Sequence, residues 1–319
     1  MISNADLCSV KSGNTGWENC GIDIERIKSI LIMPRSLAFD ADDIASDADL
    51  IAALQAATVA DKSGRLYPLM DRVVMMTNNT AEPTQDTAGY GNLMGVIFGK
   101  HNFQMRIDNN GLHLFQQLFK FNNNKGLSFA FIDGNGKLFA RKYSTGFKGM
   151  PGQIIVNQTM PAVDATVMTQ NLSIILDEED AIMNDAKLFV YPFSSDYVLG
   201  DYLHGIHDVV LSGTATSSKI EVRGILPANF VDFVALYATE LAATDAWVVT
   251  DQATGAAITP SGVTVSGSTV SIAATLSAGT TYLVSLAAPA DLIELTAPIG
   301  SLTTGGYESN VLKVTVPGA

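Results

Sequence analysis

Long apolar runs, basic side chains and cysteines are all scarce in this sequence of 319 residues. No apolar stretch reaches the roughly 18 residues that a membrane-spanning helix needs, so we expect no such helix. Only 19 Lys and Arg stand against 32 Asp and Glu, which gives a formal net charge of −13 and a pI near 4.6. A surface with this charge repels nucleic acid and anionic membranes, so we expect no tight DNA binding and no membrane partner.

The two cysteines, Cys8 and Cys20, could pair with each other but do not form a disulfide framework. The first residues lack a basic segment followed by an apolar one, so we expect no secretory signal and reduced thiols in a protein made in the cytoplasm. Hydrophobic residues make up 47% and charged residues 16% of the chain, which is typical of a folded protein. The length suits two domains, or one large domain with an appended module.

The sequence contains no P-loop, no dinucleotide-binding glycine motif and no Gly-x-Ser-x-Gly nucleophile motif. Paired carboxylates of the glycosidase kind cannot be recognised from sequence spacing, and nothing specific supports them. We therefore predict that the protein is not an enzyme and uses no cofactor.

Two patterns could suggest a metal site, and neither meets the requirements. His204 and His207 could share a metal on a helix, but Gly205 disfavours a helix there, and we interpret both as polar linker residues. The acidic residues 40–43 resemble the start of a calcium loop, yet Ile44, Ala45 and Ile51 would occupy its fifth, sixth and twelfth positions. We predict no metal site.

The stretch 108–143 carries the clearest structural pattern. Residues 111–121 predict a short helix with one apolar face formed by Leu112, Phe115, Leu118 and Phe119. Residues 127–132 and 137–143 alternate in polarity as strands do, and Asp-Gly-Asn-Gly at 133–136 predicts the turn of a hairpin. We expect the other elements nearby to form a sheet that this helix covers.

The remainder of the N-terminal part predicts mostly short strands. One further helix, rich in alanine, is predicted at 48–57. Residues 77–90 predict a polar arm or contact loop, and residues 146–152, with Pro151, predict a mobile connector. The predicted strands are 27–33, 71–76, 93–98, 102–107, 153–157, 165–176 and 187–191.

After residue 205 Ala, Thr, Ser, Val and Gly dominate, and the pattern of short strands predicts an immunoglobulin-like β-sandwich with Trp247 in a central strand. We predict domains at 1–207 and 208–290, while the segment 291–319 could complete the sandwich or return to the first domain. The predicted fold class is mainly β: a sandwich or barrel flanked by a short helix, followed by an immunoglobulin-like sandwich. The predicted strands are 208–211, 219–222, 233–237, 246–250, 262–265, 269–273, 281–286 and 310–316.

One acidic cluster remains, formed by Asp177, Glu178, Glu179 and Asp180. Four adjacent carboxylates repel one another, so they are solvated, bound to cations or used to repel another anion. A solvated loop or helix start is the simplest interpretation.

The helix at 111–121, the hairpin at 127–143, the polar arm at 77–90 and the sandwich after 208 together resemble the tail tube proteins of long-tailed bacteriophages. That family folds as a β-sandwich flanked by a helix, and some members carry an immunoglobulin-like domain. The resemblance implies a virion protein, assembled in the cytoplasm of the bacterial host, that forms stacked hexameric rings and contacts other tail or head proteins. It also implies a lumen through which genomic DNA passes without tight binding.

Under this resemblance two sets of residues have expected roles. Phe115, Leu118 and Phe119 would support the sheet that builds the ring, and the carboxylates at 177–180 would line the lumen and repel DNA. A capsid decoration or head-fibre protein is the alternative, and a glycan-binding surface adhesin or an enzyme with an accessory sandwich is a more distant one.

Overall fold

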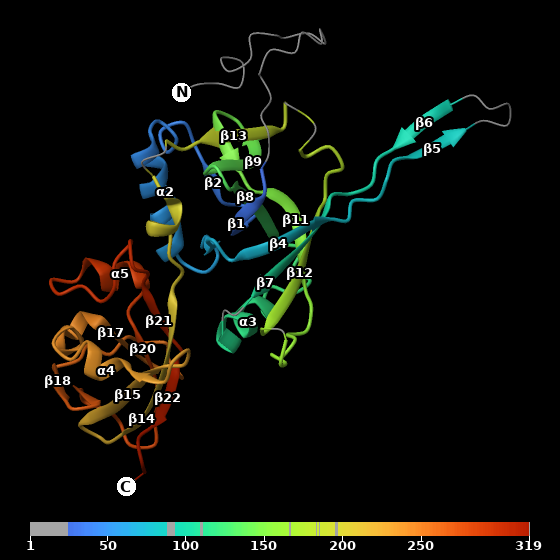
Figure 1. The fold of residues 1–319 in the computed structure, drawn as a ribbon. Coiled ribbons are helices and arrows are strands. Elements are labelled where there is room, and N and C mark those ends of the chain that lie inside the picture. Colours follow the sequence, from blue (N-terminus) through green and yellow to red (C-terminus); the bar gives the residue numbers. More distant parts are fainter. Residues whose placement is uncertain are drawn as a thin grey trace. The chain divides into compact units, whose positions relative to one another are not determined.

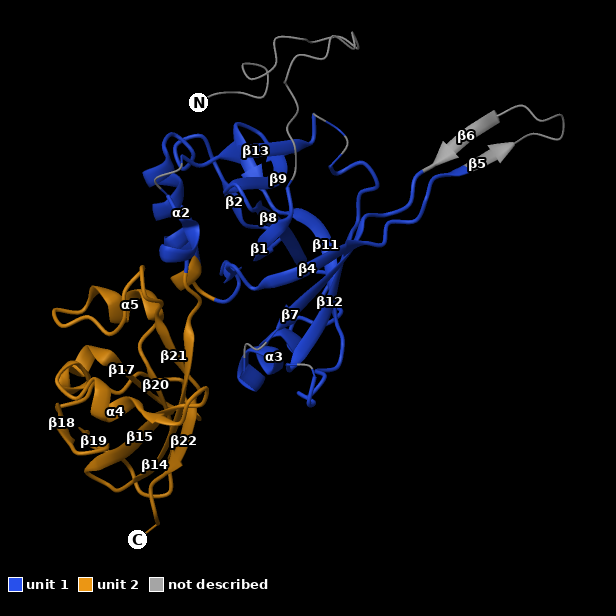
Figure 2. Ribbon diagram, in the orientation of Figure 1, with its two compact units in different colours: residues 1–57, 62–203 blue, residues 58–61, 204–319 orange. Residues whose placement is uncertain are grey.

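The computed structural model describes residues 25–87, 93–108, 111–165, 167–182, 184, 186–194 and 197–318. Cys8 and Cys20 lie outside these residues. The chain divides into two compact units, with unit 1 formed by residues 1–57 and 62–203 and unit 2 by residues 58–61 and 204–319 (Figures 1 and 2). The fold is mainly β, as the sequence predicted.

Unit 1 is built on one antiparallel sheet of eleven strands, whose main path runs β2-β10-β9-β8-β11-β12-β7-β4. Strands β1 and β3 join it through β8 and β1, and β13 joins it through β9. The bounds are β1 (Ile27–Pro34), β2 (Ala38–Phe39), β3 (Tyr67–Leu69), β4 (Val73–Asn78), β7 (Asn102–Asp108), β8 (Leu127–Asp133), β9 (Lys137–Tyr143), β10 (Gly146–Lys148), β11 (Met150–Val156), β12 (Thr169–Leu176) and β13 (Leu188–Pro192).

Strand β8 lies at the centre of this sheet. It pairs with β1 along one edge and with both β9 and β11 along the other, so its backbone groups are satisfied on both sides. The predicted hairpin with β9 is confirmed: the carboxylate of Asp133 accepts hydrogen bonds from the backbone N–H groups of Asn135 and Lys137, each 2.9 Å long. Gly136 has a φ of +77°, a conformation that glycine adopts at little cost.

Both faces of β8 are buried, which the alternating pattern of the sequence did not predict. Phe129 and Phe131 belong to a core that also contains Leu172 and Ile174 of β12. The side chains between them, such as Ile132, belong to a second core on the opposite face. The apolar side chains on this second face must also be shielded from water, and the helix that follows β2 packs against them.

That helix is α2 (Asp47–Val59), confirmed close to its predicted bounds. Leu50 and Leu54 are fully buried in the second core. Ser46 caps its start: its hydroxyl accepts from the N–H of Asp49 and donates to the Asp49 carboxylate. The first core is covered by α3 (Gly111–Phe119), where Phe115 and Leu118 are buried.

The segment between β4 and β7 forms a separate two-stranded sheet of β5 (Thr84–Thr87) and β6 (Leu93–Ile97), paired antiparallel. The predicted arm at 77–90 therefore contains part of a hairpin, and its last residues lie outside the described ranges. In Figure 1 the chain leaves β4, passes through this hairpin and returns along β7.

Unit 2 is a sandwich of two sheets that share one core. Trp247 is buried in that core, and its indole N–H donates to the carbonyl of Leu241 over 2.9 Å. One sheet has β14 (His207–Ala215), β15 (Lys219–Leu226), β16 (Val231–Asp232), β18 (Gly262–Ser266), β19 (Thr269–Ala273) and β21 (Tyr307–Ser309), and the other has β17 (Trp247–Asp251), β20 (Thr281–Leu286) and β22 (Leu312–Thr315).

The last strand, β22, pairs with β20, and β21 pairs in parallel with β14. The segment that the sequence left unassigned therefore belongs to the sandwich of unit 2. Two helices complete the unit, α4 (Phe233–Leu236) and α5 (Pro289–Glu294). Three short 3-10 segments lie at Leu199–Asp201 in unit 1 and at Glu240–Ala242 and Thr244–Ala246 in unit 2.

Two predictions of local structure were wrong. Residues 233–237 do not form a strand, because Asp232 caps α4 by accepting a hydrogen bond from the N–H of Ala235. Residues 146–152 are not a mobile connector but parts of β10 and β11. Their glycines allow close packing: a Cβ on Gly146 would lie 2.0 Å from the carbonyl oxygen of Phe39.

Candidate assembly surfaces

The first candidate surface is the edge strand β4. It ends the main path of the sheet, and β7 is its only strand partner in the described part of the chain. Val74 and Met75 of this strand are 46% and 50% exposed. An edge strand presents a row of backbone donors and acceptors that another chain can pair with, and here two of the exposed side chains are apolar and none is charged. A register shift between Val73 and Met75 interrupts the pairing with β7.

The second candidate surface is the outer face of α3, where the prediction for Phe119 was wrong. Phe115 and Leu118 are buried as expected, but Phe119 is 55% exposed and Leu112 is 56% exposed. At 100° per residue the two exposed side chains share one side of the helix with Gln116, because they are seven residues apart. The apolar face that the sequence predicts for this helix is wider than the part of the helix that packs on the core. The side that contains Leu118 packs on the core, and the side that contains Phe119 stays exposed.

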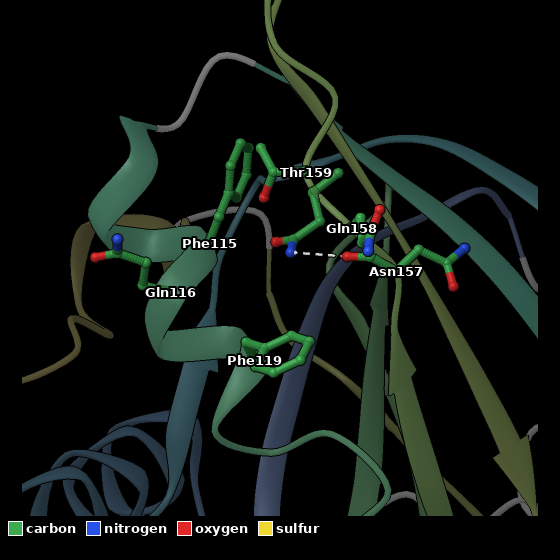
Figure 3. Close-up of a pocket in the computed structure, with 7 residues that line it drawn as sticks. Phe115, Gln116, Phe119, Asn157, Gln158 and Thr159 are labelled. Atoms are coloured by element: carbon green, nitrogen blue, oxygen red, sulfur yellow. Dashed lines mark hydrogen bonds between the residues drawn. The ribbon is translucent and has the colours of Figure 1, made fainter.

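A shallow pocket of about 290 Å³ lies between α3 and the segment that follows β11 (Figure 3). It is lined by Phe115, Gln116, Phe119, Asn157, Gln158, Thr159 and Gln170. Figure 3 shows Phe115 and Phe119 reaching from the helix toward residues 157–159. Gln170 is buried: its amide nitrogen donates to the carbonyl of Asn157 over 3.3 Å, and its Oε1 has no hydrogen-bond partner.

Beyond the pocket, the connection between β11 and β12 exposes three further apolar side chains: Met160, Val163 and Val167. Met160 is held by two backbone hydrogen bonds with Thr169, of 2.8 and 3.0 Å, so its position is fixed relative to β12. We name α3 residues Leu112, Gln116 and Phe119, together with residues 157–160, the α3 face.

The acidic cluster at 177–180 is largely neutralised. Asp177 pairs with Arg35, Glu178 pairs with Arg141 and Lys187, and Asp180 pairs with Lys187 at 2.7 Å. Hydrogen bonds from Asn184 and Lys187 lower the pKa of the Asp180 carboxyl. Four carboxylates thus face three cations, and the cluster contributes about one net negative charge. The role of Asp177, Glu178, Glu179 and Asp180 as a lumen lining stays a prediction, with less charge than the sequence suggested.

His101 lies just before β7, where the chain returns from the β5–β6 hairpin. It is buried and stacks on Phe103, and its Nε2 has no hydrogen-bond partner. Burial lowers the pKa of its imidazole, and this outweighs the opposing effects of the Glu179 backbone and the Asp180 charge. Burial of His101 therefore favours its neutral form.

Within the described ranges, no group of three or more His, Cys, Asp or Glu could hold a metal ion. The ring of His207 contacts Tyr307 in unit 2. The helices of the described part of the chain are too short or too polar to cross a membrane.

Sequence reasoning missed the pocket and the exposed side of α3. The spacing of Leu112, Gln116 and Phe119 was visible, but the rotation of the helix on the sheet decides which apolar residues it buries. Gln158, Thr159 and Gln170 gave no signal, because they come together only when β11 and β12 pair.

Comparisons with known proteins give little guidance. No protein-family model matches the chain, and no curated protein matches it. Among solved structures, the N-terminal part of the bacterial S-layer protein SbsC is 20% identical, with a TM-score of 0.24. The match covers 34% of this chain and 24% of that chain, so it spans only about a quarter of the S-layer structure.

Proposed function

We propose that this protein is a structural virion protein whose copies assemble into stacked rings that form the tube of a phage tail. The observation that supports self-assembly is the edge strand β4, which is unpaired on its outer side in the described part of the chain and exposes Val74 and Met75. Pairing such an edge with a second copy satisfies its backbone groups and removes apolar side chains from water.

A ring follows when the contact joins two different surfaces and the rotation between copies closes. The hexameric symmetry, the passage of DNA and the contacts with other tail or head proteins come from the resemblance to tail tube proteins. Location in the virion, after assembly in the host cytoplasm, is part of the same proposal. The net charge of −13 supports a tube through which DNA moves without sticking.

Unit 2 has the role of an accessory on the outside of the assembly. Its two sheets bury their apolar faces against each other in one core, so it needs no neighbour to be stable. Ring formation is then a property of unit 1.

A charge placed on the edge tests the proposal. Val74→Lys puts an ammonium group on β4, and lysines on edge strands block pairing with other chains. Val248→Lys is the matched control, because Val248 is a strand valine of unit 2 that is 44% exposed, close to the 46% of Val74. We expect Val74→Lys to abolish rings in electron micrographs and Val248→Lys to leave them intact. Rings that survive Val74→Lys would refute the role of the edge.

A further inference from the structure

We infer that the α3 face is a second contact surface, and that its occupant is another copy of this chain. The inference rests on the proposed self-assembly and extends it to a surface separate from the β4 edge.

The exposure of this face is unusual for a surface that stays in water. Leu112 and Phe119 on the helix, and Met160 beside the pocket, are each more than half exposed. Phe115 and Leu118 already anchor α3 to the sheet, and Leu112 and Phe119 lie outside the buried core that these two residues join. Large apolar side chains gathered around a concave site are typical of surfaces that another protein covers.

The volume and the lining of the pocket suit side chains of another protein chain better than a small molecule. Its volume of about 290 Å³ is at the lower limit for ligand sites, and no charged residue lines it. Phe115 and Phe119 form apolar walls, and Asn157, Gln158 and Thr159 supply uncharged polar groups on the facing side, whereas the Gln116 amide points away from them (Figure 3). An apolar centre with an uncharged polar rim is the usual anatomy of a protein interface. The Oε1 of Gln170 in its wall is a buried acceptor that still lacks a donor.

The net charge of the chain favours a second copy as the protein that binds the α3 face. The chain carries a net charge of −13, so two copies repel each other wherever their charged surfaces meet. Helix α3 contains no Asp, Glu, Lys or Arg, and neither do residues 157–163. Like charges brought together across an interface are costly, and an uncharged face avoids that cost. A basic partner would gain more from the acidic surface elsewhere than from this face.

The test is a pair of matched substitutions in the full chain, studied by sedimentation velocity over a range of concentrations. Phe119→Asp places a carboxylate on the α3 face, and Phe230→Asp places one on unit 2, where Phe230 is 82% exposed. Because both side chains are exposed, both variants keep the fold, which circular dichroism checks. We expect Phe119→Asp to weaken assembly roughly 30-fold or more in dissociation constant, as loss of an interface hot spot does, and Phe230→Asp to change it little.

A photo-crosslinking side chain at Leu112 supplies the second readout. In a mixture of ¹⁴N- and ¹⁵N-labelled protein, we expect crosslinked peptides that combine both labels, which identifies a second copy. Crosslinks only within one chain, or equal assembly of Phe119→Asp and the parent protein, would overturn the inference while leaving the proposed function standing. A parent protein that stays monomeric at every concentration would overturn both.

Discussion

The two sides of α3 make the sharpest prediction about stability. Leu118 is buried in the core of unit 1, whereas Phe119, the next residue, is more than half exposed. Leu118→Ala removes buried methyl groups and leaves a cavity, which costs about 3 kcal/mol. Phe119→Ala removes a partly solvated ring and costs less than about 1 kcal/mol. Adjacent residues of one helix should therefore differ at least about threefold in their effect on the free energy of unfolding.

Thermal unfolding measures this difference. For a unit of about 200 residues, 3 kcal/mol corresponds to a fall in Tm of roughly 6 to 12 °C. Leu118→Asp adds the cost of a buried carboxylate, which brings the loss close to the whole stability of a typical domain, so unit 1 should not fold. Rings should be absent in that variant for this reason.

The chain offers an internal control for the same experiment. Its two tryptophans are Trp17 and Trp247, so in a Trp17→Phe background the fluorescence reports only Trp247, in the core of unit 2. We expect the Leu118 variants to lower the transition of unit 1 and to leave the Trp247 transition unchanged. Equal losses for Leu118→Ala and Phe119→Ala would contradict the packing of α3, and a shift of the Trp247 transition would show that the units do not unfold independently.

Three further outcomes are expected. Removing residues 204–319 should leave a folded unit 1 that still forms rings in negative-stain micrographs. Loss of rings would show that unit 2 takes part in assembly. Deleting only residues 208–290 is a poorer test, because β21 and β22 would lose their partners β14 and β20. Gly146→Ala should lower the Tm of unit 1 by about 4 to 8 °C, an effect of about 2 kcal/mol, because its Cβ would collide with the Phe39 carbonyl. An unchanged Tm would refute the close packing of β2 and β10. Because burial lowers the pKa of His101, unit 1 should lose stability as the pH falls below about 6.5, where the unfolded chain takes up a proton that the folded chain resists. His101→Gln should make the Tm of unit 1 depend less on pH in thermal melts from about pH 7.5 to 5. An unchanged pH dependence of the Tm would show that His101 is not the group responsible.

Local patterns in the sequence were enough for most elements of the fold. The Asp-Gly-Asn-Gly turn predicted the β8–β9 hairpin, and the alanine-rich stretch predicted α2. Trp247 and the regular strand pattern around it pointed to a sandwich, which the shared core of unit 2 confirms. These features depend on neighbours in the sequence, so the sequence alone reveals them.

The wrong predictions concern residues whose structure depends on contacts with segments that are distant in the sequence. Gly146 suggested a flexible connector, but it is a glycine because β10 lies against the Phe39 carbonyl. The segment 233–237 has strand-like composition, yet the cap at Asp232 starts a helix. The acidic cluster suggested an anionic surface, whereas Arg35, Arg141 and Lys187 approach it from other parts of the chain. Phe119 was assigned to the core because a helical pattern does not give the orientation of the helix on its sheet.

The most direct test of self-assembly is the size of the purified protein of 319 residues at neutral pH. Sedimentation velocity, combined with negative-stain microscopy, distinguishes a 33.8 kDa monomer from closed rings or tubes. We expect ring-sized or longer particles at micromolar concentration, with a fraction that rises with protein concentration. A single monomeric species at every concentration and salt level would contradict the proposal that this protein builds a tube from copies of itself.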